Sequence, residues 1–208
     1  MSAEYSMFWK NRREYPPVIF NYRRRYIDLG KVLKFTSDAE KILDIGCGEG
    51  SLILMLREVS NIKEYYGFDL SVHFIKNLKK KWGDFPGLKT AEYNCGLGGK
   101  LPKVDLCVCM GVMLYMSDIE VEKMLSSVDA TKFLCRVPCV LGKDRIEIDK
   151  FSKEFNDRYV ATYRTISEYL NLLNKFFKVV SVERCYPDEI ESEFGTKQFF
   201  FVCDRKST

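Results

Sequence analysis

The residues best suited to bind a ligand are Gly46, Gly48 and Gly50, which occupy every second position shortly after Asp44. Glycine reaches positive φ angles and lets the backbone approach a ligand without a Cβ atom in the way. The glycines follow an apolar run that suits a buried strand, and a helical pattern begins directly after them. A strand, a glycine turn and a helix in this order form a ligand site at the carboxyl end of a central strand in α/β sheets.

The spacing of these glycines differs from that of a dinucleotide fingerprint, G-x-G-x-x-G, because Ser51 stands where the third glycine of that pattern belongs. Asp69 ends the next strand-like run, 19 residues after Gly50 (69 − 50). Nucleotide sites of α/β proteins place a carboxylate there to accept hydrogen bonds from ribose hydroxyls. An N-cap role for Asp69 is the alternative, but Ser71 suits that role better. The sequence therefore predicts a cofactor that contains a nucleoside.

Strand-like and helix-like segments alternate along the chain, which predicts an α/β fold with a doubly wound, mostly parallel sheet. We expect parallel strands at 42–45, 64–71, 87–94, 104–110 and 132–140 and helices at 18–35, 51–59, 72–82 and 165–177. A further helix should begin with the capping box at 117–120. The last two strands, 178–185 and 198–204, have no helix between them and therefore predict a carboxyl-terminal antiparallel hairpin. The expected sheet thus has seven strands.

Several segments resemble class I S-adenosylmethionine (SAM)-dependent methyltransferases of the small-molecule type. The Asp-x-Gly-x-Gly-x-Gly sequence at 44–50 resembles their motif I. Residues 104–116 resemble the Phe-Asp-Leu-Val…Val-Leu-x-His-Leu segment that lines the cleft between methyl donor and acceptor, with Tyr115 where many relatives carry His. Residues 8–12 resemble a Tyr-Trp-x-x-Arg start of methyltransferases acting on glycans and other small metabolites. The resemblance implies a Rossmann-like fold and SAM as the cofactor.

The resemblance also implies a set of cofactor-binding residues. Asn94 stands where relatives often carry an Asp that accepts a hydrogen bond from the adenine amino group, and its side-chain carbonyl could accept the same bond. Asp44 would order the glycine turn. The residues expected to bind the cofactor are Asp44, Gly46, Cys47, Gly48, Gly50, Asp69, Leu70, Asn94, Cys95 and Met110.

Methyl transfer from SAM is an in-line displacement that depends mainly on proximity and orientation. We expect a small polar acceptor, such as a sugar or another metabolite hydroxyl, and oxygen rather than nitrogen as the methylated atom. If an oxygen acceptor needs a base, the candidates in falling order are Tyr115, Asp157, Tyr159 and His73. His73, the only histidine, could equally cap a helix or face solvent.

Two other functions stay open. Residues 10–34 hold eight basic side chains against two acidic ones, which would suit a nucleic-acid methyltransferase but also a solvated helix face. Pro138-Cys139 lies at the end of the fifth expected strand rather than the fourth, which argues against cytosine-carbon methylation. The second open function is a regulatory module that binds SAM without turnover, because methyl transfer requires no particular catalytic side chain that would mark an enzyme.

The composition sets further limits. The 208 residues suit one domain with a sizeable core, and we expect an N-terminal helical cap at 1–36, a methyltransferase domain at 37–208 and an acceptor-recognition insertion at about 142–164. The eight cysteines form no Cys-x-x-Cys pair, so we expect buried thiols and no metal site. No apolar run reaches the ~18 residues of a membrane span and the start lacks a signal-peptide pattern, so we expect a cytoplasmic protein.

Overall fold

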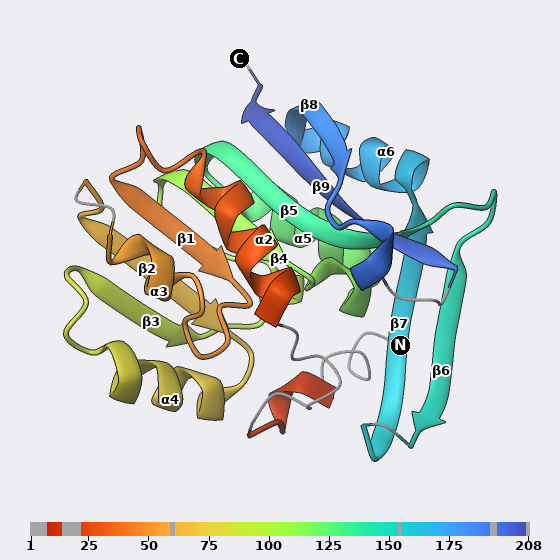
Figure 1. The fold of residues 1–208 in the computed structure, drawn as a ribbon, viewed down its shortest axis with the longest axis horizontal. Helices are drawn as coiled ribbons and strands as arrows, with labels where there is room; N and C mark the ends of the chain where they lie inside the picture. The colour runs from red at the N-terminus through yellow and green to blue at the C-terminus, as the bar shows by residue number, and fades with distance from the viewer. Residues whose placement is uncertain (1–7, 14–21, 59–60, 154, 192–194, 207–208) are drawn as a thin grey trace.

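The computed structural model of this chain describes residues 8–13, 22–58, 61–153, 155–191 and 195–206. Parallel strands form its centre (Figure 1): β1 (Lys41–Ile45), β2 (Glu64–Asp69), β3 (Leu88–Glu92), β4 (Val104–Met110) and β5 (Ala130–Val140). The strand order is β3-β2-β1-β4-β5, followed by β7 (Asp157–Thr165) and β6 (Ile146–Ser152). On the other side of β5, β9 (Thr196–Arg205) pairs antiparallel with β5 and with β8 (Phe177–Arg184). The predicted mostly parallel sheet with a carboxyl-terminal hairpin is confirmed.

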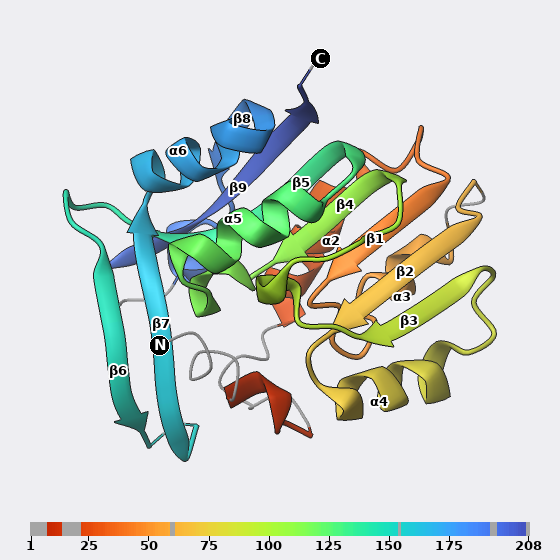
Figure 2. The ribbon, with the colours of Figure 1, turned by 180° about the vertical axis from the view of Figure 1, so that it is seen from behind.

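Helices cover both faces of this sheet (Figures 1 and 2). One face carries α2 (Tyr22–Leu33), α3 (Ile53–Leu56) and α4 (Val72–Trp82), and the other carries α5 (Asp118–Ser127) and α6 (Ile166–Phe176). Alternate residues of the strands divide between two apolar clusters, because successive side chains of a strand point to opposite faces. Within β1, Ile42 packs on the α2 side and Leu43 on the α5 side.

The helix starts follow their capping residues. Ser71 caps α4 by accepting from the Phe74 N–H at 3.3 Å, which leaves Asp69 available for another role. Ser117 and Thr165 form capping boxes with Glu120 and Glu168 at the starts of α5 and α6. These caps fix where each helix leaves the sheet edge that carries the site.

The helix expected at 51–59 is much shorter in the structure, where α3 spans only Ile53–Leu56. The N–H groups of Ile53 and Met55 bond to carbonyls three residues earlier, at 3.1 Å each, as in a 3₁₀ turn. Those of Leu56 and Arg57 bond to carbonyls four residues earlier, at 3.1 and 3.0 Å, as in an α-helix. Such short turns carry little of the macrodipole of a long helix.

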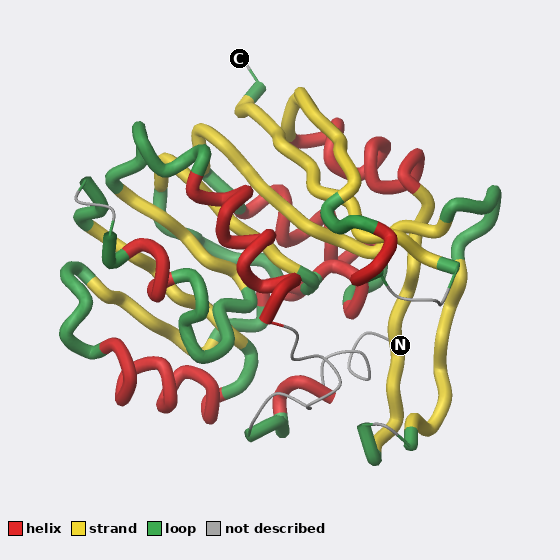
Figure 3. The backbone as a smooth tube through the Cα atoms, in the orientation of Figure 1, coloured by secondary structure: helices red, strands yellow, loops and turns green. Residues whose placement is uncertain are grey.

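The expected insertion at 142–164 is a two-stranded antiparallel hairpin, β6–β7, which was not predicted as strands. It extends beyond the carboxyl edge of the parallel strands, away from the rest of the sheet (Figure 3). β7 pairs with β5 only at Cys139↔Arg164 and Val140↔Thr165. The seven predicted strands are thus present, and this hairpin is added to them. Within the described ranges, no helix is long and apolar enough to cross a bilayer.

Candidate functional site

A cavity of about 900 Å³ lies at the carboxyl ends of the parallel strands. One part, here called the β1–β3 half, is lined by residues at the ends of those strands: Asp44, Gly46, Cys47, Asp69, Leu70, Tyr93, Asn94 and Cys95. The other part, the β4–β7 half, is lined by residues of α2, the ends of β4 and β5, the β6–β7 hairpin and β9. The cavity therefore joins the predicted cofactor residues to segments whose role the sequence left open.

The glycine turn after β1 is held tightly against its neighbours. Gly46 donates to the Phe68 carbonyl at 2.7 Å and has a φ of +75°. A Cβ atom at Gly46 would lie 2.2 Å from a methyl group of Val112, and one at Gly50 would lie 2.8 Å from the Trp82 ring. Crowding by the protein itself therefore excludes side chains at both positions. Gly46 lines the cavity, whereas Gly48 and Gly50 do not.

Asp69 connects the end of β2 to this turn. Its Oδ2 accepts from the Gly48 N–H at 2.9 Å and its Oδ1 accepts from the Ser71 N–H at 2.8 Å. Burial raises the pKa of Asp69, and the backbone N–H donors of Ser71 and Gly48 partly offset that effect. A carboxylate oxygen has a second lone pair, so Asp69 can still accept hydrogen bonds from a ligand in the cavity.

Asp44 lies at the base of the cavity and accepts a hydrogen bond from the Tyr65 hydroxyl at 2.6 Å. Burial raises the pKa of Asp44 to about 7, although the Tyr65 hydrogen bond lowers it, and the negative charge of Asp69 raises it further. Asp44 is thus half protonated near neutral pH in the ligand-free protein.

Asn94 also lines the cavity, but its Oδ1 already accepts from the Gly96 N–H at 3.1 Å and caps the 3₁₀ turn Cys95–Leu97. The second lone pair of that oxygen remains for a ligand. Cys95 lies beside it, and burial raises the pKa of its thiol to about 12. The other cavity-lining residues among those predicted for the cofactor are Cys47, Leu70 and Met110.

The four candidate bases separate in the structure. Tyr115 and Tyr159 line the β4–β7 half. Asp157 instead forms a 3.2 Å ion pair with Arg12 and is half exposed, and His73 lies in the first turn of α4. Neither Asp157 nor His73 lines the cavity.

Comparison with known proteins agrees with this architecture. Residues 43–131 match a family model described as a methyltransferase domain. The matched segment runs from β1 to the start of β5 and includes the glycine turn, Asp69 and Asn94. A search of the curated proteins finds no match to the sequence.

Solved methyltransferase structures share the fold at low sequence identity. A putative SAM-dependent methyltransferase from Listeria monocytogenes is 16% identical over 90% of this chain and 100% of its own, with a TM-score of 0.71. The N-methyltransferase NodS from Bradyrhizobium japonicum, solved with S-adenosylhomocysteine (SAH), is 11% identical over 92% of each chain, with a TM-score of 0.65. Geranyl diphosphate C-methyltransferase from Streptomyces coelicolor is 13% identical over 87% of this chain and 77% of its own, with a TM-score of 0.64. At these identities the likeness shows the fold alone.

Aromatic side chains line the β4–β7 half of the cavity. The Tyr115 ring centroid lies 5.3 Å from that of Trp9 and 6.0 Å from that of Tyr159. The Tyr159 and Tyr163 hydroxyls are 3.0 Å apart. Burial raises the pKa of Tyr115 to about 12 and those of Tyr159 and Tyr163 higher still, so all three phenols are neutral at pH 7.

Sequence reasoning missed the residues that the hairpin and β5 contribute to this cavity. Ile146 and Ile148 alternate on β6, and Tyr159 and Tyr163 share a face of β7, which is a strand signal. Arg136 interrupts the apolar strand β5, and a charge within a buried strand is itself a functional signal. Both signals were present in the sequence but were obscured by the charged residues around them.

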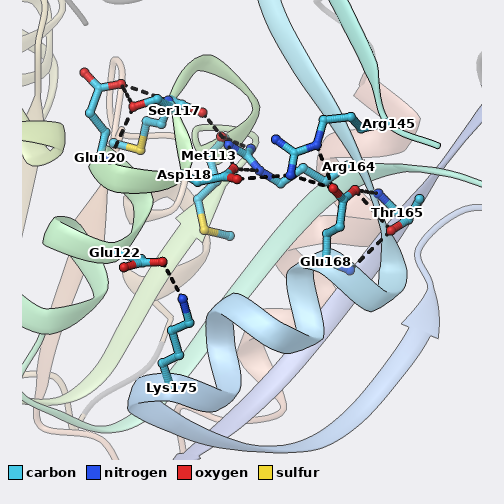
Figure 4. Close-up of polar contacts among 11 residues, drawn as sticks. Met113, Ser117, Asp118, Glu120, Glu122, Arg145, Arg164, Thr165, Glu168 and Lys175 are labelled. Carbon is cyan, nitrogen blue, oxygen red and sulfur yellow. Dashed lines mark hydrogen bonds and ion pairs between the residues drawn. The ribbon is translucent and has the colours of Figure 1, made fainter.

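A fully buried guanidinium, that of Arg164 on β7, fixes the segment that carries Tyr115 (Figure 4). Its nitrogens donate to the Met113 carbonyl at 3.0 Å and the Met116 carbonyl at 2.6 Å, and Nε donates to the Asp118 carboxylate at 2.8 Å. The chain from β4 to α5 is thereby tied to the hairpin.

Asp118 and Arg145 extend this contact to α6. Arg145 donates to Asp118 at 3.0 Å and to Glu168 at 2.6 Å, and Glu168 belongs to the capping box of α6 (Figure 4). Burial raises the pKa of Asp118, but the hydrogen bonds from Arg145 and Arg164 outweigh it, so the pKa is lowered overall. One carboxylate thus links α5 to two arginines of the hairpin region.

We expect Arg164→Leu to lower the free energy of unfolding by about 3–5 kcal/mol, because it leaves Asp118 and two carbonyls without their buried partner. Arg145→Leu is the matched control, since it removes a partner of the same Asp118 from a side chain that is 33% exposed. It should cost less than about 1 kcal/mol. Urea unfolding monitored by circular dichroism measures both, and equal losses would contradict the structural role of Arg164.

The raised pKa of Asp44 predicts a pH dependence. The folded state holds the proton up to about pH 7, whereas the unfolded chain releases it near pH 4. The contribution of Asp44 to stability therefore falls as pH rises between these values. The stability of Asp44→Asn relative to the unmodified protein should rise from pH 4 to pH 7 and level off above it, as measured by urea unfolding without cofactor. A difference independent of pH would show that Asp44 has an ordinary pKa.

Proposed function

We propose that this protein is a class I SAM-dependent methyltransferase and that it transfers the methyl group to a small polar acceptor held in the β4–β7 half of the cavity. The observation that carries the proposal is the β6–β7 hairpin. Together with Trp9 and α2 it walls the cavity beyond the ends of β4 and β5. A walled cavity of about 900 Å³ suits a metabolite-sized acceptor beside a nucleoside cofactor.

The residues of the β1–β3 half fit SAM by the chemistry of their donors and acceptors. Asp69 would accept hydrogen bonds from the ribose hydroxyls, the second lone pair of Asn94 Oδ1 would accept from the adenine amino group, and the Gly46 backbone leaves room for the methionine part. SAM supplies a methyl group already activated on a sulfonium. We further propose that residues 1–36 act as the N-terminal cap and 37–208 as the methyltransferase domain.

The protein contributes mainly orientation and exclusion of water. The rings of Trp9, Tyr115 and Tyr159 provide flat apolar surfaces against which an acceptor can be aligned. Alignment and proximity account for most of what an in-line displacement needs. Tyr115 and Tyr159 remain the base candidates for an oxygen acceptor, but their raised pKa values suit acceptors that are already nucleophilic at neutral pH.

A nucleic-acid acceptor is the second candidate. Arg24 and Arg25 at the start of α2 line the cavity, and Arg23 beside them is exposed. Backbone phosphates could contact such a patch, and binding would then weaken steeply with salt.

We expect Asp69→Ala to weaken SAH binding by about 1.5–3 kcal/mol, because it removes hydrogen bonds to a charged acceptor and releases the Gly48 N–H. Glu64→Gln is the control, since it changes a carboxylate at the opposite end of the same strand. Isothermal titration calorimetry with SAH measures both, and NADH serves as the negative ligand. Unchanged affinity in Asp69→Ala would remove Asp69 from the cofactor site.

The acceptor class can be tested with methyl-tritiated SAM. The purified protein should transfer label to a component of a polar metabolite extract and leave purified total RNA unlabelled. Label in RNA that disappears as salt rises would favour the second candidate. SAH binding with no transfer to either would support a binding module without turnover.

A further inference from the structure

Arg136 places a positive charge in the wall of the β4–β7 half. It lies near the carboxyl end of β5, in register with Met110 at the end of β4. Leu134, two residues earlier on the same face, packs in the apolar cluster beneath α2. The Arg136 side chain is only 19% exposed, yet it lines the cavity.

The surrounding residues hold the guanidinium without using all of its donors. Nη1 donates to the Gln198 side-chain carbonyl at 2.8 Å. Nε lies 3.2 Å from the Asp28 carboxylate but lacks hydrogen-bond geometry, and that carboxylate accepts from the Tyr186 hydroxyl at 2.8 and 2.9 Å. Within the described part of the chain, Nη2 has no hydrogen-bond acceptor. A guanidinium carries five N–H donors, so Arg136 retains N–H groups that can donate to a ligand.

A glycine gives the guanidinium its position. A Cβ atom at Gly111, where φ is +72°, would lie 2.9 Å from Nη2. Gly111 directly follows β4, and its N–H donates to the Arg136 carbonyl at 2.8 Å. Arg136 therefore lies directly over the loop that leads to Tyr115.

The wall around Arg136 carries more positive than negative charge. Its described cavity-lining residues from α2, β5, β9 and the adjoining turn include Arg24, Arg25 and Arg136 against Asp28. Lys150 and Lys153 of the hairpin line the same half. Apolar walls concentrate the field of such charges in a cleft.

We infer that the β4–β7 half binds an anionic group of the acceptor, a carboxylate or a phosphate, with Arg136 as the residue that recognises it. Arginine donates two parallel N–H bonds to either group. The inference rests on the proposed function and narrows its acceptor class. It also explains why several cationic side chains line a half of the cavity whose aromatic side chains are neutral.

Three fluorinated probes test this inference in protein saturated with SAH, in which the cofactor site is filled. 4-Fluorobenzoate and 4-fluorophenyl phosphate carry the two anions on a ring that suits the aromatic wall, and 4-fluorobenzamide is the neutral match. Ligand-observed ¹⁹F NMR should show binding of one or both anions and at least roughly tenfold weaker binding of the amide, as expected when a charged hydrogen bond is lost. The stronger of the two anions identifies the group.

Two variants assign the effect to Arg136. Arg136→Gln should weaken the preferred anion roughly tenfold or more. Gln198→Glu places a negative charge against Nη1 with little change in shape and should weaken the anion similarly, which keeps the test available if Arg136→Gln does not fold. Arg205→Gln is the control, because Arg205 pairs with Asp129 at the opposite end of the sheet. SAH affinity should be unchanged in all three variants.

Equal binding of the anions and the amide, or no binding of any probe, in protein that binds SAH would overturn the inference and leave the proposed function intact. A tenfold loss of SAH affinity in Arg136→Gln would assign Arg136 to the cofactor instead and overturn the inference as well. Failure of the unmodified protein to bind SAH would be a failure of the proposed function.

Discussion

The buried guanidinium of Arg164 is the contact on which the arrangement of the site depends. The loop after β4 leads directly into α5, and Arg164 ties both of them to the base of the β6–β7 hairpin, which comes from a later part of the chain. Burying a charge costs several kcal/mol in desolvation, and such a contact persists only where nearly every donor has a partner. Two carbonyls and a carboxylate meet that condition. The result is a loop whose conformation is held by one residue that lies 48 to 51 positions later in the chain.

The two halves of the cavity are stabilised in different ways. In the β1–β3 half, backbone N–H groups and the Asp69 carboxylate hold the turn, and the glycines are required because Val112 and Trp82 crowd them. In the β4–β7 half, large aromatic side chains and arginines form the walls on elements added to the parallel sheet. A cofactor common to many proteins suits a site made from backbone, whereas an acceptor specific to one enzyme suits a site made from side chains that can vary.

Much of the fold could be predicted from the sequence because it follows local rules. Periodicity located β1 to β5, and Ser71, Ser117 and Thr165 marked helix starts that their side chains do cap. The hydrogen bond from the Gly48 N–H to Asp69 could not be foreseen, because it joins residues 21 positions apart that only the fold brings together. The bond from the Gly96 N–H to Asn94 is local, but it depends on the turn that the chain makes after β3. The hairpin escaped prediction because one of its faces is polar and carries alternating charges, as in the Asp149–Arg158 pair. Arg136 was hidden for a similar reason, since its role depends on neighbours from α2 and β9.

The β6–β7 hairpin is joined to the main sheet at its base only. This junction is short, since β7 pairs with β5 at two positions, one of which is Arg164. A hairpin held only at its base would move most at its tip, but contacts with the amino-terminal segment also hold the tip. Arg12 donates to the Phe155 carbonyl at 3.0 Å and pairs with Asp157 across a sequence separation of more than a hundred residues. The amino-terminal segment thus supports the tip of the hairpin, so this wall of the cavity is held at its base by Arg164 and at its tip by Arg12.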